Sequence, residues 1–193
     1  MTDLTLWHVP FSRSSRILWL LEEIGCPYQL ERLECPDTLD AALHPPRPPA
    51  LRDGKVTMHE TGAMTEWLCE TRAADLWRQP GGAGRIGWLD WLHFAETLLQ
   101  HVARRAEPAA SQRLSAALDL LDDWLEDSDW LLTEFSGADC QLGYSLWMAD
   151  RIASVEARPA VAAYLSRCTA RPAFRKAFGG QSSWPKNVDE RPI

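Results

Sequence analysis

A glycine-rich break at residues 78–85, RQPGGAGR, separates two parts of the chain with different patterns. Before the break, short β-prone runs alternate with helical patterns, whereas the periodic segments after it all have helical spacing. Glycine and proline together interrupt helices and strands alike, so the break is typical of a linker. A chain of 193 residues is long enough for two small domains. We therefore predict an α/β domain over about residues 1–75 and an all-α domain over about 85–193.

The first part has the predicted element order β-α-β-α-β-β-α. Leu4–His8 (LTLWH) alternates and is rich in β-prone residues, and helical spacing follows until Gly25 ends the helix. The pair Asp53 and Gly54 predicts the turn of a β-hairpin. A second strand (YQLERLE), a short helix (DTLDAAL) and a helix over about residues 60–72 complete the unit.

The second part is helical throughout. Its segments are WLDWLHFAETLLQHV, RLSAALDLLDDWLED, SGADCQLGYSLWMADRI, RPAVAAYLSRCTA and RPAFRKAF. In the third segment, Ser136 is followed three residues later by Asp139, which is a capping box with Asp in place of Glu or Gln. The last two segments each have a proline near their start, which suits the first turn of a helix.

Charge and composition exclude several classes of protein. The formal net charge is −7, which argues against a nucleic-acid partner because phosphate binding needs a clustered basic surface. No apolar run approaches the ~20 residues of a membrane span, and the N-terminus lacks the pattern of a secretory signal. The five cysteines are scattered, without a CxxC pair or metal-ligand spacing. These features predict a cytoplasmic protein that has reduced thiols and no metal site.

The pieces, taken in this order, resemble the cytosolic glutathione transferase family, in its serine-type, bacterial-like branches. The resemblance rests on SRSSRILWLLEEIGCPY, PPALRDGKVTMHETGAM, WLHFAE and LLTEFSGADCQLG, and extends over nearly the whole chain. It implies a thioredoxin-like domain that binds glutathione, followed by the helical domain of the glutathione transferase fold. It also implies glutathione as co-substrate, a small hydrophobic electrophile as acceptor, a role in detoxification and a homodimer.

The resemblance implies a role in glutathione binding for the prolines before the hairpin. Pro49 occupies the place of the family's cis-proline, which presents a backbone edge to the cysteinyl unit of glutathione. Arg47 takes the basic position of the same segment. Pro48 stands where relatives have a residue that bonds glutathione through both its N–H and its C=O, and proline has no N–H. The resemblance therefore predicts that glutathione binds more weakly than in those relatives.

Two further positions match the family's glutathione contacts. Glu60 and Thr61 correspond to the Glu-Ser pair at the start of a helix, where the dipole and free N–H groups suit a carboxylate. Ser12 corresponds to the serine that stabilises the glutathione thiolate, although Ser14 and Ser15 could do the same. The strand and loop before this helix contain no tyrosine or cysteine, which argues against tyrosine-type and cysteine-type enzymes.

Two hypotheses for function follow. The first is a glutathione S-transferase that adds the glutathione thiolate to small electrophiles or reduces organic peroxides, with Ser12, Glu60 and Thr61 in its favour. The alternative is a catalytically weak transferase-like binding or interaction protein, which the missing N–H of Pro48 favours. For the homodimer, the tryptophan-rich stretch WLDWLHF and Trp67 predict the interface, because aromatic residues are enriched in interfaces.

Overall fold

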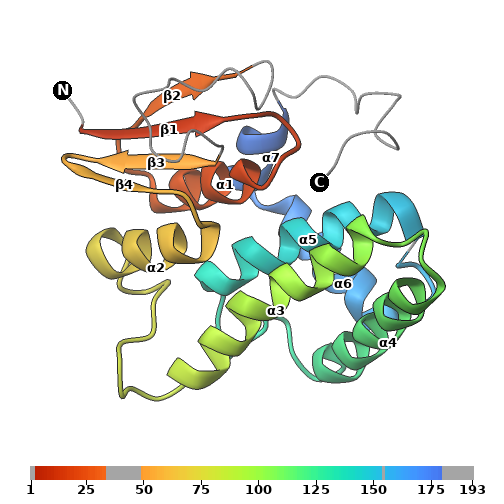
Figure 1. Cartoon of the computed structure of the whole chain (residues 1–193). Coiled ribbons are helices and arrows are strands. Elements are labelled where there is room, and N and C mark those ends of the chain that lie inside the picture. The colour runs from red at the N-terminus through yellow and green to blue at the C-terminus, as the bar shows by residue number, and fades with distance from the viewer. Residues whose placement is uncertain (1–2, 34–48, 154, 180–193) are drawn as a thin grey trace. The chain divides into compact units, whose positions relative to one another are not determined.

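The computed structural model describes residues 3–33, 49–153 and 155–179. The chain divides into two compact units (Figure 1). The first unit joins the chain up to Ala73 with helix α7 (Pro172–Gly179), and the second unit is Ala74–Arg171. The predicted fold class, a thioredoxin-like α/β domain and an all-α domain in the glutathione transferase fold, is confirmed.

The first unit is built on a four-stranded mixed sheet with the strand order β2-β1-β3-β4. Its first strand is parallel to β2 and antiparallel to β3, which in turn pairs antiparallel with β4. Two helices, α1 and α2, lie on the same side of this sheet (Figure 1). The elements are β1 (Leu4–His8), α1 (Ser14–Ile24), β2 (Gln29–Arg32), β3 (Ala50–Asp53), β4 (Val56–Met58) and α2 (Thr61–Arg72).

Local sequence explains the ends of these elements. Helix α1 stops at Gly25, which takes a left-handed conformation (φ 70°) and donates its N–H to Leu21 O at 3.0 Å. Glycine adopts this conformation without the steric cost of a Cβ atom. Gly54, with φ 58°, makes the predicted hairpin turn between β3 and β4 in the same way. The short helix predicted from DTLDAAL lies outside the described residues.

Helix α7 differs from the expectation that residues 85–193 form one helical domain. It packs against α1 in the first unit. Phe174 of α7 meets the ring of Trp19 edge to face, with ring centroids 5.0 Å apart, and Lys176 forms an ion pair with Glu22 at 2.5 Å. The physical reason is the apolar face of α7, on which Phe174 and Phe178 are buried. Helical periodicity reveals such a face without revealing which helix covers it.

The second unit is entirely helical within the described residues. Its central pair, α3 and α5, lie side by side (Figure 1). The buried Asp139 carboxylate caps α5 by accepting the N–H and the hydroxyl of Ser136, at 2.8 and 3.0 Å. Asp122 caps α6 from a distance, since it accepts the N–H groups of Ala160 and Val161. The helices are α3 (Arg85–Ala103), α4 (Pro108–Leu125), α5 (Gly137–Ala153) and α6 (Pro159–Ala170).

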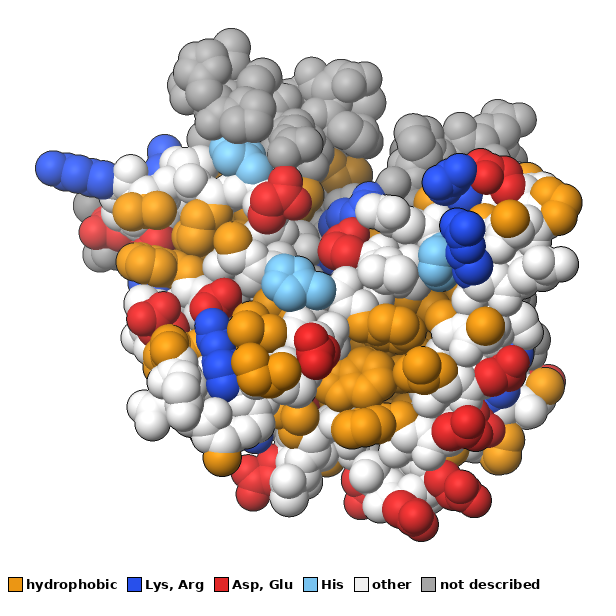
Figure 2. Space-filling model, turned by 60° about the horizontal axis from the view of Figure 1, so that its bottom comes forward, with side chains coloured by type: hydrophobic (Ala, Val, Ile, Leu, Met, Phe, Trp, Pro, Cys, Tyr) orange, Lys and Arg blue, Asp and Glu red, His pale blue; other side chains and the backbone are white. Residues whose placement is uncertain are grey.

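The tryptophans of WLDWLHF do not form an exposed surface. Trp88 is fully buried and Trp91 is 7% exposed, so both belong to the core of the second unit. The large apolar side chains of this unit that are exposed are Ile86 at 71%, Leu120 at 52% and Trp124 at 51%. Leu120 and Trp124, together with Trp91, line an open hollow of about 690 Å³. Figure 2 shows hydrophobic side chains gathered on one face of the molecule, with acidic side chains around them.

Candidate functional site

The sheet topology brings the predicted site residues of the first unit to one end of the sheet. Strand β1 ends at His8, and β3 runs antiparallel to it, with Trp7 opposite Ala50. Pro49, just before β3, therefore lies at the end where the loop to α1 begins. Strand β4 returns to the same end before α2 begins at Thr61. Segments far apart in the sequence thus meet at this end.

A compact network of hydroxyl groups connects β1 to α1. Ser12 Oγ lies 2.8 Å from Ser14 Oγ and donates to Val9 O at 2.8 Å. The backbone N–H of Ser14 donates to Ser12 Oγ at 3.2 Å, and that of Val9 to Ser14 Oγ at 3.1 Å. His8 Nδ1 lies 2.8 Å from Ser14 Oγ. The network therefore runs from His8 through Ser14 to Ser12.

The three candidate serines differ in accessibility. Ser14 and Ser15 are fully buried, whereas Ser12 is half-buried. The Ser15 hydroxyl has no hydrogen-bond partner among the described residues. A buried hydroxyl cannot touch a ligand in solvent, so Ser12 is the serine of the three that can make this contact.

The backbone just before Ser12 is strained. Phe11 has φ 64°, a left-handed conformation that is unfavourable for a bulky residue. Such a conformation costs about 1–3 kcal/mol and is found most often where a site needs a particular backbone shape. Here it accompanies a tight turn in which the N–H of Ser12 donates to Val9 O at 3.2 Å. The turn holds the Ser12 hydroxyl beside the start of α1.

The start of α2 is tied to α1 by a buried arginine. Arg16 is fully buried, and its Nη1 donates to Thr61 Oγ1 at 3.2 Å. Thr61 Oγ1 accepts this bond, and a hydroxyl group can both accept and donate. Glu60 is the N-cap residue of α2, with an extended backbone and an exposed side chain. The helix end therefore offers N–H groups, a hydroxyl and a nearby carboxylate.

Two predicted glutathione contacts, Arg47 and Pro48, lie outside the described residues. Pro49 is described and is half-buried, immediately before the fully buried Ala50. The described residues that the fold brings to the same end of the sheet are thus Ser12, Ser14, Pro49, Glu60 and Thr61.

Two residues at this end were not predicted from the sequence, His8 and Arg16. His8 follows Leu4 and Leu6 on one face of β1, so alternation could have identified a histidine that points into the core. Burial, and secondarily the positive charge of Arg32 on β2, lowers the pKa of His8 to about 4, which keeps the imidazole neutral near neutral pH. Arg16 gives no such signal, because an arginine on a helix is ordinarily on the surface.

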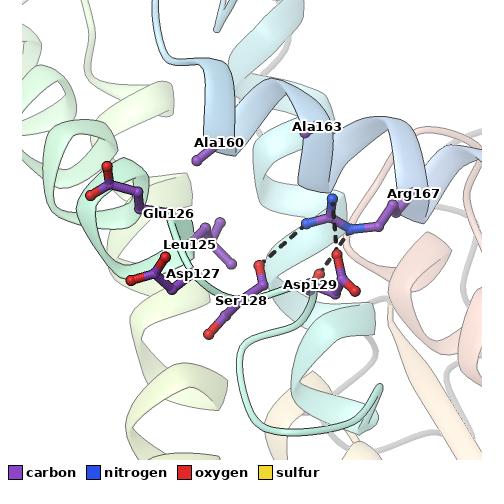
Figure 3. Close-up of a pocket in the computed structure, with 8 residues that line it drawn as sticks. All are labelled: Leu125, Glu126, Asp127, Ser128, Asp129, Ala160, Ala163 and Arg167. Carbon is purple, nitrogen blue, oxygen red and sulfur yellow. Dashed lines mark hydrogen bonds and ion pairs between the residues drawn. The ribbon is translucent and has the colours of Figure 1, made fainter.

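One hollow of the second unit has a structural role. Its volume is about 390 Å³, and it is lined by the end of α4, the loop after it and α6 (Figure 3). Its arginine, Arg167, donates through Nε to Asp129 O at 3.0 Å and forms an ion pair with Asp129 Oδ1 at 3.4 Å. These bonds hold the loop against α6, so the guanidinium group of Arg167 is already paired within the protein.

Two other features, a metal site and a membrane-spanning helix, are not found among the described residues. No three His, Cys, Asp or Glu side chains among them are grouped as a metal site would require. None of the helices in this part of the chain combines the length and the apolar character needed to cross a membrane.

Comparison with known proteins identifies the family. Residues 2–70 match the glutathione S-transferase N-terminal domain, and residues 90–172 match the glutathione S-transferase C-terminal domain. The chain therefore belongs to the glutathione S-transferase family, and this membership supports glutathione transferase function. A search of curated protein sequences finds no significant match.

Solved structures of similar proteins have the same fold. A glutathione transferase from Methylococcus capsulatus is 25% identical, with 92% of this chain and 98% of that chain covered and a TM-score of 0.79. A glutathione S-transferase from Actinobacillus pleuropneumoniae is 22% identical, covering 92% of each chain with a TM-score of 0.80. A Pseudomonas putida glutathione transferase with bound glutathione disulfide is 19% identical, covering 92% and 91% with a TM-score of 0.77.

Proposed function

We propose that the chain is an enzyme that activates the thiol of glutathione at Ser12 and transfers the thiolate to small hydrophobic electrophiles. The observation that carries the proposal is the meeting of the half-buried Ser12 hydroxyl and the start of α2 at one end of a thioredoxin-like sheet. Family membership supports glutathione as the co-substrate.

Ser12 acts on the sulfur in this proposal. The thiolate is the nucleophile, and lowering a thiol pKa by ~2 units takes ~2.7 kcal/mol of selective stabilisation of the anion. A hydrogen bond from the Ser12 hydroxyl and the N-terminal end of α1 supply part of this. With an activated aryl chloride, a carbon–sulfur bond forms and chloride leaves. With an organic peroxide, two glutathiones are oxidised to the disulfide while the peroxide becomes an alcohol and water.

The start of α2 binds the γ-glutamyl end of glutathione. Its carboxylate accepts hydrogen bonds from the Thr61 hydroxyl and from free N–H groups of the helix. Glu60 accepts from the ammonium group of the ligand, which its exposed side chain can reach. The segment of Arg47, Pro48 and Pro49 presents its backbone to the cysteinyl unit, with one donor fewer because Pro48 has no N–H.

A homodimer and a cytoplasmic location complete the proposal. Family resemblance supports the dimer, and the exposed Leu120 and Trp124 supply apolar surface of the kind that interfaces bury. Cys26 and Cys168 are free thiols, as expected in a reducing compartment.

Binding and turnover of glutathione test the proposal. Titration calorimetry with glutathione and with S-methylglutathione should give saturable binding, and conjugation to an activated aryl chloride should depend on both substrates. Absence of binding at millimolar glutathione would overturn the enzyme proposal. In that case the alternative, a transferase-like interaction protein, would replace it, and the lack of a donor at Pro48 would be its physical basis.

A further inference from the structure

The hydroxyl network at the start of α1 has an inner end, the His8 imidazole, that no ligand can reach. His8 and Ser14 are fully buried, and Ser12 is the member with accessible surface. The network therefore leads from the core of the first unit to Ser12, the serine of the three that is not fully buried. The direction in which its hydrogens point decides whether Ser12 can donate outward.

The tautomer of His8 sets that direction. His8 Nε2 is buried and has no hydrogen-bond partner among the described residues. A proton on Nε2 would leave a buried N–H unpaired, which proteins rarely tolerate, whereas a bare lone pair is less costly. The proton therefore belongs on Nδ1, which lies 2.8 Å from Ser14 Oγ and can donate to it.

With this tautomer the lone pairs of Ser14 are fully used. Ser14 Oγ accepts from His8 Nδ1–H and from the backbone N–H of Val9 at 3.1 Å. A hydroxyl oxygen has two acceptor sites, so it cannot also accept from Ser12 at 2.8 Å. The Ser14 hydrogen must instead point to Ser12 Oγ or to Val9 O, at 2.8 and 3.1 Å.

The consequence falls on Ser12. Its hydrogen cannot turn inward to Ser14 and has either Val9 O, at 2.8 Å, or a ligand as acceptor. When the Ser12 hydroxyl hydrogen points to a ligand, the Ser14 hydroxyl can donate to Val9 O in its place. The Val9 carbonyl oxygen therefore keeps a hydrogen-bond donor. The opposite tautomer would draw the Ser14 hydrogen to His8 and open Ser14 Oγ to the Ser12 hydrogen.

We propose that His8 is a positioning residue, which acts through Ser14 to keep the Ser12 hydroxyl hydrogen available to the glutathione thiolate. This inference rests on the proposed function, because it requires a thiolate at Ser12. The low pKa of His8, about 4, keeps the ring neutral, and Arg32 on β2 is the charged neighbour that adds to the effect of burial. A neutral ring can hold one tautomer through the pH range in which a thiol ionises.

Two substitutions separate hydrogen bonding from packing. In His8→Asn, the amide nitrogen can take the place of Nδ1–H, whereas His8→Leu has no donor there. The ultraviolet absorbance of bound glutathione, followed against pH, reports the apparent thiol pKa. We expect His8→Leu to raise this pKa by about one unit and His8→Asn to leave it near the wild-type value. Affinity for S-methylglutathione, which has no thiol, should change by less than about twofold in both.

Each result of this experiment has a definite meaning. Equal thiol pKa values in the two variants would overturn the inference while leaving the proposed function intact. No binding of S-methylglutathione or glutathione to the wild type would overturn the proposed function and the inference with it. Nitrogen-15 spectra of the wild-type imidazole need no variant to fold, and a proton on His8 Nε2 would also overturn the inference.

Discussion

Nη1 of Arg16 lies 3.2 Å from Oγ1 of Thr61, and this buried hydrogen bond joins two helices at residues 45 positions apart in the sequence. The bond holds the start of α2 against α1 and fixes which way the Thr61 hydroxyl faces. Both side chains are buried, so removal of the acceptor leaves a charged donor without this partner. The stability of the first unit and the shape of the candidate carboxylate site therefore depend on the same contact.

Thr61→Val should affect both properties. Valine keeps the shape of threonine and loses the hydroxyl, so we expect the free energy of unfolding to fall by about 1–3 kcal/mol and affinity for S-methylglutathione to fall by about tenfold. Thr61→Ser is the matched control, because it keeps the hydroxyl and should retain most of the affinity. Urea unfolding and titration calorimetry measure the two effects. Equal affinity in the valine and serine variants would contradict a role for the hydroxyl in binding.

Ser12→Ala should change thiol ionisation more than affinity. Loss of one hydrogen bond to the thiolate should raise the apparent pKa of bound glutathione by about one unit, because that bond favours the anion. Ser15→Ala is the matched control, since Ser15 is buried and its hydroxyl has no partner among the described residues. Thiolate absorbance against pH measures both variants. A shift with Ser15→Ala and none with Ser12→Ala would move the proposed role away from Ser12.

Asp139 should make stability depend on pH. Burial raises the pKa of this carboxyl to about 6, against the donors that favour its charged form, which include Leu131 N–H and Tyr164 O–H. A folded-state pKa above the usual 3.8 means that the folded protein holds the proton more tightly than the unfolded chain. The stability that this proton supplies is complete below about pH 4 and is lost as the pH rises through about 6.

Asp139→Asn isolates this contribution. Asparagine cannot titrate, and in either orientation its amide nitrogen replaces a carboxylate oxygen that accepts a backbone N–H, from Leu131 at 3.1 Å or from Ser136 at 2.8 Å. We expect the variant to be less stable, and the wild-type advantage to be larger at about pH 4 than at about pH 7 by roughly 2 kcal/mol. Urea unfolding of both proteins across this range gives the comparison. An advantage that does not change with pH would show that Asp139 titrates alike in the folded and unfolded states.

Leu120→Glu should weaken the proposed homodimer. Leu120 is 52% exposed beside Asp123, so a further carboxylate adds charge repulsion and removes apolar surface. Sedimentation velocity at micromolar concentration should show wild-type dimer and a larger fraction of 21.8 kDa monomer for the variant. Gln112→Glu, an exposed change on the same helix, is the control and should remain dimeric. A monomeric wild type would contradict the proposed dimer itself.

Residues close together in the sequence could be interpreted from the sequence alone. The strand Leu4–His8 and the turn at Gly54 depend on side-chain alternation and on backbone conformations that glycine favours. Ser136 and Asp139 are three residues apart, so their capping contact is also local. For the same reason, the motif around Ser12 was enough to predict a site there, and that site stays a prediction.

The tertiary structure decided what depends on contacts between distant segments. Helical periodicity predicts an apolar face on α7, but only the packed structure shows that Trp19 of α1 covers part of this face. Trp88 and Trp91 were predicted to lie at an interface and are instead buried in the second unit, because an aromatic pattern does not distinguish a core face from a surface face. The roles of His8 and Arg16 could be inferred only from their contacts with Ser14 and Thr61, which the folded chain brings within hydrogen-bond distance. The sequence by itself determined the local elements and the family, because both depend on motifs of residues that are close together in the chain. Only the tertiary structure decided which of the serines keeps accessible surface and which residues lie behind it, because burial exists only once the sheet and helices have packed.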